Sequence, residues 1–202
     1  MNKKENDKAI EFYRSLAKKE IENEKIVDGV LIGPRSRVKT DELSIDDIIN
    51  PSRHFLAKDA GEELDSTYVS TFRIGHFNMP IQLASTSKGT TFVGGMEFGS
   101  NLVKQKIINN IDELVTFLAD YKMGIVDIFD EKEKDGKMIM EIRVYECIEC
   151  ADLPNIGKPL CFFEAGVLTG IFKELTKKDV IAEELRCWTS GYSFCQFNVT
   201  IN

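Results

Sequence analysis

The 202-residue chain has few of the groups on which common catalytic sites depend, with two histidines and one tryptophan. Neither His54 nor His76 lies beside a recognisable acid or nucleophile, so we assign no catalytic base. The glycine patterns of phosphate-binding loops and dinucleotide-binding folds are also missing. We therefore assign no catalytic residues, leave cofactor-binding residues unassigned, and favour a binding role over an enzymatic one.

The sequence also lacks an excess of positive charge and any long apolar run. Its net charge of −7 offers no concentrated basic surface, which argues against direct binding of nucleic acid. No apolar stretch approaches the ~20 residues that a membrane-spanning helix needs. The first eight residues are mostly charged, and no apolar segment follows them. We therefore expect no signal peptide and no membrane span, and a cytoplasmic location.

Five cysteines are present, an odd number that does not suit a complete set of disulfides. In a chain without a secretion signal, thiols are expected to stay reduced and to serve as metal ligands or to remain free. Hydrophobic residues make up 43% of the chain, enough for a sizeable core. A bound metal would therefore add to a fold that is already stabilised by apolar burial.

The N-terminal part is predicted to be a helical extension over residues 1–50, preceding a domain over residues 51–202. Within residues 5–24, apolar side chains recur at helical spacing but form only a narrow stripe. Such a helix packs weakly on its own chain or joins a partner subunit. Ser44, with Asp47 three residues later, marks the start of a short helix over residues 45–49. Residues 50–92 have no clear pattern.

The rest of the chain predicts an α+β fold. Helices are expected over residues 93–106, from Asn110 onward, and over residues 160–175. Asp135-Gly136 is typical of a hairpin turn between two strands, and two further strands are expected over residues 179–187 and 194–201. The simplest assembly is a four-stranded antiparallel sheet with helices packed on one face.

The candidate metal ligands are near the C-terminus. Cys161 is at the start of an apolar helix, whose dipole is expected to favour the thiolate. Cys187 and Cys195 flank a tight turn between two strands, so they can approach each other. Thiolates together with a carboxylate suit a tetrahedral zinc ion. Strand alternation places Glu183 on the face of Cys187, so Glu184 would need a bulge to reach the same ion.

Several interpretations stay open for the neighbouring residues. Cys147 and Cys150 form a Cys-x-x-Cys pair that could replace Glu184 in an all-thiolate site, or remain as two unliganded thiols. Free cysteines can also pack simply as small hydrophobic residues. Gly166 and Gly170, four residues apart, favour close packing of their helix against the sheet or against a ligand.

The pattern Cys161-x-x-Glu164-x-Gly-x-x-x-Gly, followed by Glu184-x-x-Cys187 and Cys195-x-Phe, resembles the 4-vinyl reductase domain family. That family includes phenol-type effector domains of bacterial transcription activators, a bacteriochlorophyll biosynthesis accessory protein and archaeal stand-alone proteins. The resemblance is specific over about residues 140–200. It implies a fold shared with vesicle-transport TRAPP subunits and ligand-binding domains of nitric-oxide signalling. It also selects Glu184 as the fourth ligand.

The resemblance further implies a protein that binds a small hydrocarbon-like or tetrapyrrole-like molecule and contains a structural zinc ion. Cys161, Glu184, Cys187 and Cys195 would fill all four zinc positions and leave none for a reactive water. Alternatives are an accessory enzyme or carrier in tetrapyrrole metabolism, or a dimeric scaffold subunit. We expect an apolar cavity between the sheet and the helices at about 93–106 and 160–175. Because the vesicle-transport relatives pair through helices, we also expect a homodimer that uses the helix at residues 5–24.

Overall fold

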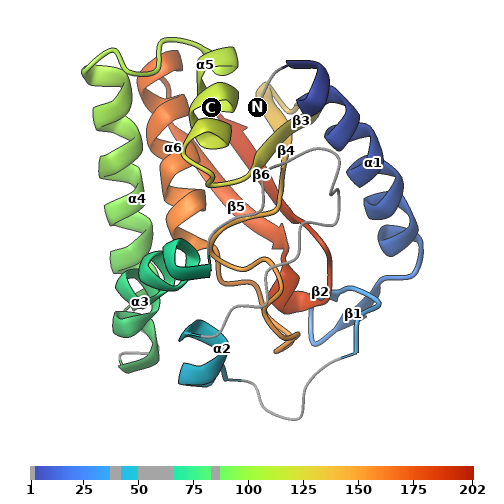
Figure 1. Cartoon of the computed structure of the whole chain (residues 1–202). Coiled ribbons are helices and arrows are strands. Elements are labelled where there is room, and N and C mark those ends of the chain that lie inside the picture. Colours follow the sequence, from blue (N-terminus) through green and yellow to red (C-terminus); the bar gives the residue numbers. More distant parts are fainter. Residues whose placement is uncertain (1–2, 37–41, 50–65, 83–86) are drawn as a thin grey trace.

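The computed structural model describes residues 3–36, 42–49, 66–82 and 87–202, and residues 50–65, with His54, lie outside them. A four-stranded sheet occupies the centre, and helices lie on both sides of it (Figure 1). The helices are α1 (Lys3–Glu22), α2 (Ile45–Ile49), α3 (Ser66–Gln82), α4 (Ser87–Lys104), α5 (Ile111–Asp120) and α6 (Phe162–Thr176), with a 3-10 turn η1 (Trp188–Ser190). The strands are β1 (Lys25–Val27), β2 (Val30–Ile32), β3 (Ile125–Lys134), β4 (Lys137–Tyr145), β5 (Val180–Arg186) and β6 (Cys195–Ile201).

The central sheet is antiparallel throughout and has the strand order β3-β4-β6-β5. Strands β3 and β4 are joined by a hairpin turn at Asp135 and Gly136. These two residues have positive φ values of 53° and 75°, as a tight two-residue turn requires. Strands β1 and β2 form a separate two-stranded hairpin. The predicted four-stranded antiparallel sheet and its turn are confirmed.

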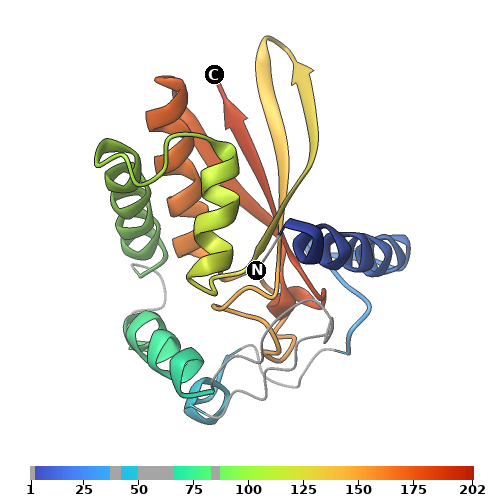
Figure 2. The same cartoon turned by 45° about the horizontal axis from the view of Figure 1, so that its top comes forward.

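The larger hydrophobic core lies between this sheet and the helices α4, α5 and α6 (Figure 2). Alternate residues of β4, namely Met140, Ile142 and Val144, are buried in it. The residues between them point to the other face, which α1 partly covers (Figure 2). The α+β fold class is confirmed, with one more helix on the opposite face.

Helix α1 buries its narrow stripe against its own chain. Ala9, Tyr13 and Ala17 are at most 1% exposed, and Tyr13 stacks on Tyr145 of β4 with ring centroids 4.8 Å apart. A partner subunit is therefore not needed to cover this stripe, which removes the reason for placing a dimer contact there. The homodimer itself stays a prediction.

Helices α4 and α6 pack against each other through glycines. A Cβ added to Gly166 or Gly170 would collide with the carbonyl oxygens of Phe92 and Met96 in α4. Gly95 and Gly99 of α4 face carbonyl groups of α6 in the same way. The α6 glycines were expected to allow close packing against the sheet or a ligand, and their close neighbour is instead α4. The two helices therefore touch backbone to backbone.

Local signals fixed the starts of two helices. Asn110 caps α5 by accepting a hydrogen bond from the backbone N–H of Glu113 at 2.9 Å. Ser44 and Asp47 bond to each other at the start of α2, as predicted. Helix α4 begins at Ser87, before the expected residue 93, and α3 was not predicted. None of the helices in the described ranges combines the length and the apolar character needed to cross a membrane.

Candidate metal centre

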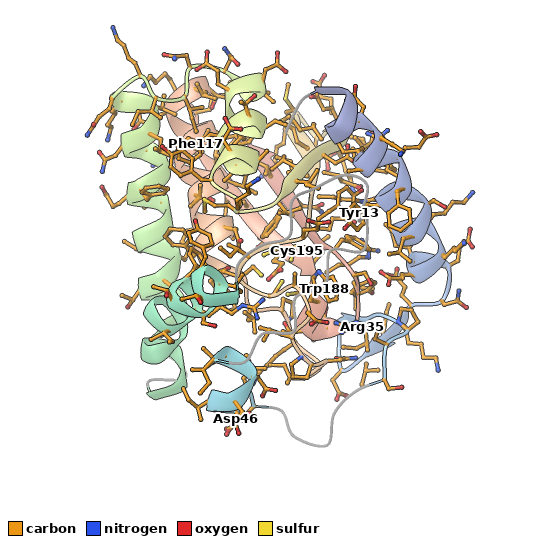
Figure 3. All side chains as sticks on the ribbon, viewed as in Figure 1. Tyr13, Arg35, Asp46, Phe117, Trp188 and Cys195 are labelled. Carbon is orange, nitrogen blue, oxygen red and sulfur yellow. The ribbon has the colours of Figure 1, made fainter. Side chains whose placement is uncertain are left out.

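All five cysteines meet in one buried cluster at the lower end of the sheet, where Cys195 is labelled in Figure 3. None of the five side chains has measurable exposed surface. Cys147 and Cys150 belong to the loop after β4, and Cys161 lies directly before α6. Cys187 follows β5, and Cys195 begins β6. Four separate segments of the chain therefore supply the sulfurs.

The predicted ligand set is brought together. One ligand atom each from Cys161, Glu184, Cys187 and Cys195 lies within 4.8 Å of the other three. The Sγ atom of Cys161 is 3.7 Å from that of Cys187 and 3.6 Å from that of Cys195. Sulfurs bound to one tetrahedral zinc ion at ~2.3 Å lie about 3.8 Å apart. These residues therefore fit a zinc ion.

Glu184 and Cys187 reach the same cluster because β5 is irregular between them. The pairing of β5 with β6 shifts register between Glu184 and Arg186, while Glu183 is exposed. One oxygen of Glu184 accepts a hydrogen bond from the backbone N–H of Cys161 at 2.8 Å, and the other has no hydrogen-bond partner among the described residues. Burial and the neighbouring Cys187 raise the pKa of Glu184 well above its usual value. An ion at this place would supply the missing partner.

Cys147 and Cys150 join the same cluster. The Sγ atom of Cys147 is 3.7 Å from that of Cys161, and the Sγ atom of Cys150 is 3.1 Å from that of Cys195. A second set of four ligand atoms within 4.8 Å of one another therefore consists of Cys147, Cys150, Cys161 and Cys195. Both sets contain Cys161 and Cys195.

Two further carboxylates that the sequence did not single out as ligands lie beside these sulfurs. Glu164, in the first turn of α6, accepts a hydrogen bond from the Cys147 thiol at 3.0 Å. Glu149 and Glu164 each place an oxygen within 4.8 Å of the Cys161 sulfur. Burial raises the pKa of Glu149 to about 8 and that of Glu164 well above its usual value. Glu164 belongs to the Cys161-x-x-Glu164 motif that carries the family resemblance. Its place in that motif was the sequence signal that could have identified it as a candidate ligand.

Cys161 lies at the start of its helix, as expected. It is the residue before the first turn of α6, and its side chain makes no capping hydrogen bond to the helix. Burial raises the pKa of the Cys161 thiol, so the helix start alone does not favour the thiolate. A bound metal ion would have to provide that stabilisation.

Two arginines bring positive charge to the cluster. Arg73 of α3 is fully buried and donates to the carbonyl oxygens of Ile148 and Ala151, at 3.0 and 2.6 Å. Cys147 and Cys150 are among the charges that favour its protonated form, although burial lowers its pKa. The guanidinium carbon of Arg35 lies 4.8 Å from the centroid of the Trp188 ring. Cys150 and Cys187 are among the charges that favour the protonated form of Arg35, although burial lowers its pKa. No local pattern in the sequence marked either arginine.

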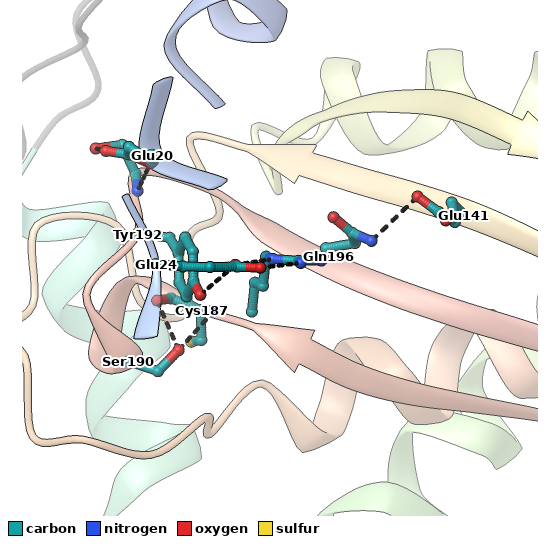
Figure 4. A network of polar contacts seen from close by, with 9 residues as sticks. Glu20, Glu24, Glu141, Cys187, Ser190, Tyr192 and Gln196 are labelled. Atoms are coloured by element: carbon teal, nitrogen blue, oxygen red, sulfur yellow. Dashed lines mark hydrogen bonds and ion pairs between the residues drawn. The ribbon is translucent and has the colours of Figure 1, made fainter. Parts of the chain in front are cut away.

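The turn that contains Cys187 is held by hydrogen bonds (Figure 4). The backbone N–H of Cys187 donates to the Ser190 hydroxyl at 3.0 Å, and the Thr189 hydroxyl donates to the Cys187 sulfur at 3.2 Å. Nearby, Tyr192 and Arg186 both donate to Glu24, just beyond α1. The cluster is thereby attached to the N-terminal part of the chain.

The apolar layer next to the cluster is nearly filled. A void of about 10 Å³ lies between α5, α6 and the sheet, which is at most the space of one water molecule. Phe98 and Met138 are 39% and 46% exposed, and Met140 is packed in the core. A ligand-sized cavity at this place is therefore not confirmed for the described residues.

Comparison with known proteins gives matches for the C-terminal part of the chain. Residues 140–201 match the model of the 4-vinyl reductase domain. An uncharacterized protein of Methanocaldococcus jannaschii is 39% identical over 104 residues, which are 52% of this chain and 61% of that protein. A second uncharacterized protein of the same organism is 29% identical over 109 residues, which are 53% and 61% of the two chains. The matching part thus spans about three fifths of the length of these curated relatives.

Several solved structures are similar. A vinyl-4-reductase family protein of Methanocaldococcus jannaschii has a TM-score of 0.48 and 21% identity, covering 70% of this chain and 85% of that one. The phenol-responsive sensory domain of the transcription activator PoxR, solved with phenol, has a TM-score of 0.48 and 13% identity, covering 93% and 89%. A trafficking protein particle complex subunit 3 from Naegleria fowleri, covalently bound to palmitic acid, has a TM-score of 0.49 and 13% identity, covering 68% and 97%.

The match to the domain model begins in β4 and ends in β6, so it includes every element that supplies a cysteine to the cluster. The similarity to the 4-vinyl reductase domain family that the cysteine motifs predicted is confirmed for residues 140–201, the segment that the domain model matches.

Proposed function

We propose that this chain is a small-molecule-binding protein, with a largely apolar, hydrocarbon-like or tetrapyrrole-like ligand, and that a structural zinc ion holds its C-terminal region together. The match of residues 140–201 to the 4-vinyl reductase domain supports the binding role. The single observation that carries the zinc site is the convergence of Cys161, Glu184, Cys187 and Cys195 within 4.8 Å.

The zinc ion would have a mechanical role. Its four ligands come from the start of α6, the end of β5, the turn after it and the start of β6. Three thiolates and one carboxylate complete a tetrahedral shell and leave no position for a reactive water. Such an ion would fix the bulge of β5 at Glu184 and join the helix to two strands.

The zinc site is tested by metal analysis of the full chain after expression with ample zinc. We expect at least one tightly held zinc ion per chain, because structural zinc sites bind with apparent free energies of ~10–16 kcal/mol. The Glu184→Gln variant should hold zinc more weakly, and Glu183→Gln is its matched control because that neighbour is exposed. Less than about a tenth of an equivalent in the wild-type protein would contradict the proposal.

The binding role is tested by native mass spectrometry of freshly purified protein. We expect an added mass that is lost in organic solvent and that corresponds to a small apolar molecule. Scaffolding is the second candidate function, because the layer between the sheet and α5 and α6, close to where a cavity was expected, holds a void of only about 10 Å³. A purified protein that carries no added mass and takes up neither phenol nor a fatty acid would favour the scaffold function.

A further inference from the structure

The cysteine cluster contains more ligand atoms than one ion can use. A tetrahedral ion takes four ligands, whereas this cluster gathers five sulfurs and the carboxylates of Glu149, Glu164 and Glu184. The two four-ligand sets share Cys161 and Cys195. They differ in that one contains Cys147 and Cys150, and the other contains Glu184 and Cys187.

The distances match two tetrahedra that share an edge. The shared edge is the separation of 3.6 Å between the sulfurs of Cys161 and Cys195. Cys161 is 3.7 Å from Cys147 on one side and 3.7 Å from Cys187 on the other. Each value is close to the ~3.8 Å expected between sulfurs on one ion. The Cys150–Cys195 separation of 3.1 Å is shorter, so an ion would push these two sulfurs apart.

Glu164 gives a second, independent indication of a cation on the side of Cys147. Its side chain is only 5% exposed, and one oxygen lies 3.0 Å from the Cys147 sulfur. Its other oxygen is buried and has no hydrogen-bond partner among the described residues. A buried carboxylate among sulfurs is costly unless a cation or a hydrogen-bond donor compensates it. An ion held by Cys147 would lie next to this carboxylate.

We propose that the cluster binds two divalent metal ions that share the sulfurs of Cys161 and Cys195. Cys147 and Cys150 complete the shell of the second ion, and Glu184 and Cys187 complete the shell of the first. The first ion is the one in the proposed function, on which this inference rests. Thiolate-rich shells select zinc and related soft or borderline ions such as cadmium.

The charges are consistent with two ions. Five thiolates and the carboxylates of Glu164 and Glu184 carry seven negative charges, and two divalent ions leave three of them. The positive charges of Arg73 and Arg35 interact with cysteines of the cluster and offset two more. Arg73 also holds the loop of Cys147 and Cys150 through the carbonyl oxygens of Ile148 and Ala151. The second shell would therefore lie on a loop that is already fixed in place.

The test is to count metal ions in the full chain and in a double variant, Cys147→Ser with Cys150→Ser. Native mass spectrometry should give two zinc ions per wild-type chain and one in the variant. Cadmium NMR of the wild-type protein needs no variant, and it should give two resonances that are split by coupling through the shared sulfurs. Glu183→Gln, which changes the exposed carboxylate that precedes Glu184 in the chain, should keep both ions.

The outcomes separate this inference from the proposed function. One zinc ion and one cadmium resonance in the wild-type protein would overturn the second ion and leave the first in place. No ion at all would overturn both. Two uncoupled cadmium resonances would refute the sharing of sulfurs, and two ions in a folded double variant would refute the assignment to Cys147 and Cys150.

Discussion

Arg73 supports the Cys147–Cys150 loop from inside the fold. Its side chain is fully buried, and it donates to the carbonyl oxygens of Ile148 and Ala151. Those oxygens lie in the interior, where a lost donor leaves them without compensation. The position of the sulfurs is therefore set partly by a cation from α3, which precedes them by about 75 residues.

Replacing Arg73 by Met should lower the free energy of unfolding by about 2–6 kcal/mol, since each of the two orphaned carbonyls costs roughly 1–3 kcal/mol. The measurement is urea denaturation followed by fluorescence of Trp188. Thr71→Ala on the same helix is the control, because Thr71 is exposed and its hydroxyl donates to the Thr67 carbonyl of its own helix. A midpoint equal to that of the control would show that the arginine does not support the loop.

The candidate ligands could be predicted because their residue types are chemically specific. Cys161, Cys187 and Cys195 were selected as thiols near the ends of predicted elements, and Glu184 was chosen through the family resemblance. Arg73 could not be found in this way. A buried arginine looks in sequence like any solvated one, and only the tertiary fold places α3 against the cysteine loop.

Among the elements, the contact of α4 with α6 is unusual because backbone atoms make it. Gly166 and Gly170 of one helix and Gly95 and Gly99 of the other allow this approach. Glycine costs a helix about 1 kcal/mol relative to alanine, so these helices accept weaker local propensity in exchange for closer packing. A side chain at the contact would force the helices apart.

Gly166→Ala should therefore destabilise the protein by about 1–3 kcal/mol, the usual cost of overpacking, despite the gain in helix propensity. Gly94→Ala in α4 is the matched control, because nothing lies within 4 Å of the Cβ it would add. That control should raise stability by up to about 1 kcal/mol. Thermal denaturation of both variants tests the opposite signs, and two stabilised variants would contradict the close contact.

The elements that the sequence predicted best have regular apolar patterns, as in α5 and β4. Helix α3 was not predicted because one of its buried residues, Arg73, is charged. Its helical spacing from the buried Val69, four residues earlier, therefore does not show as an apolar pattern. The first part of α4 was missed because Gly89 and the two threonines after it lower helix propensity. The spacing of apolar residues predicts which side chains are buried in a helix or strand. It does not predict contacts made by backbone atoms or by a buried arginine.

For the molecule as a whole, α1 and the segment after it attach to the sheet through polar contacts. Arg14 forms two hydrogen bonds with Asp127 of β3, at 2.8 and 2.6 Å. Glu24 receives two hydrogen bonds from Arg186, at 2.8 and 2.9 Å, and one from Tyr192 at 2.7 Å (Figure 4). The N-terminal part therefore contributes to the stability of the metal-binding end.

The Glu24 contact should make stability depend on pH. The Arg186 guanidinium holds the pKa of Glu24 below its usual value of 4.5. The ionised form is thus favoured in the folded chain, and the stabilisation is complete above pH 4.5 and lost as the pH falls through the lowered pKa. Glu24→Gln should unfold more easily at pH 7, by about 1–3 kcal/mol.

Urea midpoints of wild type and Glu24→Gln, measured between pH 7 and pH 3, should converge as the pH falls. Glu22→Gln is the control, since Glu22 is exposed at the end of α1. A difference that stays constant over this range would refute the assignment to the ionised carboxylate.

The predicted homodimer is tested by light scattering on the native wild-type protein. A mass near one chain that does not rise with concentration would contradict the homodimer.

The complete burial of the five sulfurs has a kinetic consequence. No chelator can touch an ion in this cluster while the surrounding loops are closed, so exchange with solvent has to wait for a local opening. The rate at which a chromogenic chelator removes the metal should then become independent of chelator concentration once the chelator is in excess. That plateau would report how often this end of the molecule opens, whatever the affinity of the ion.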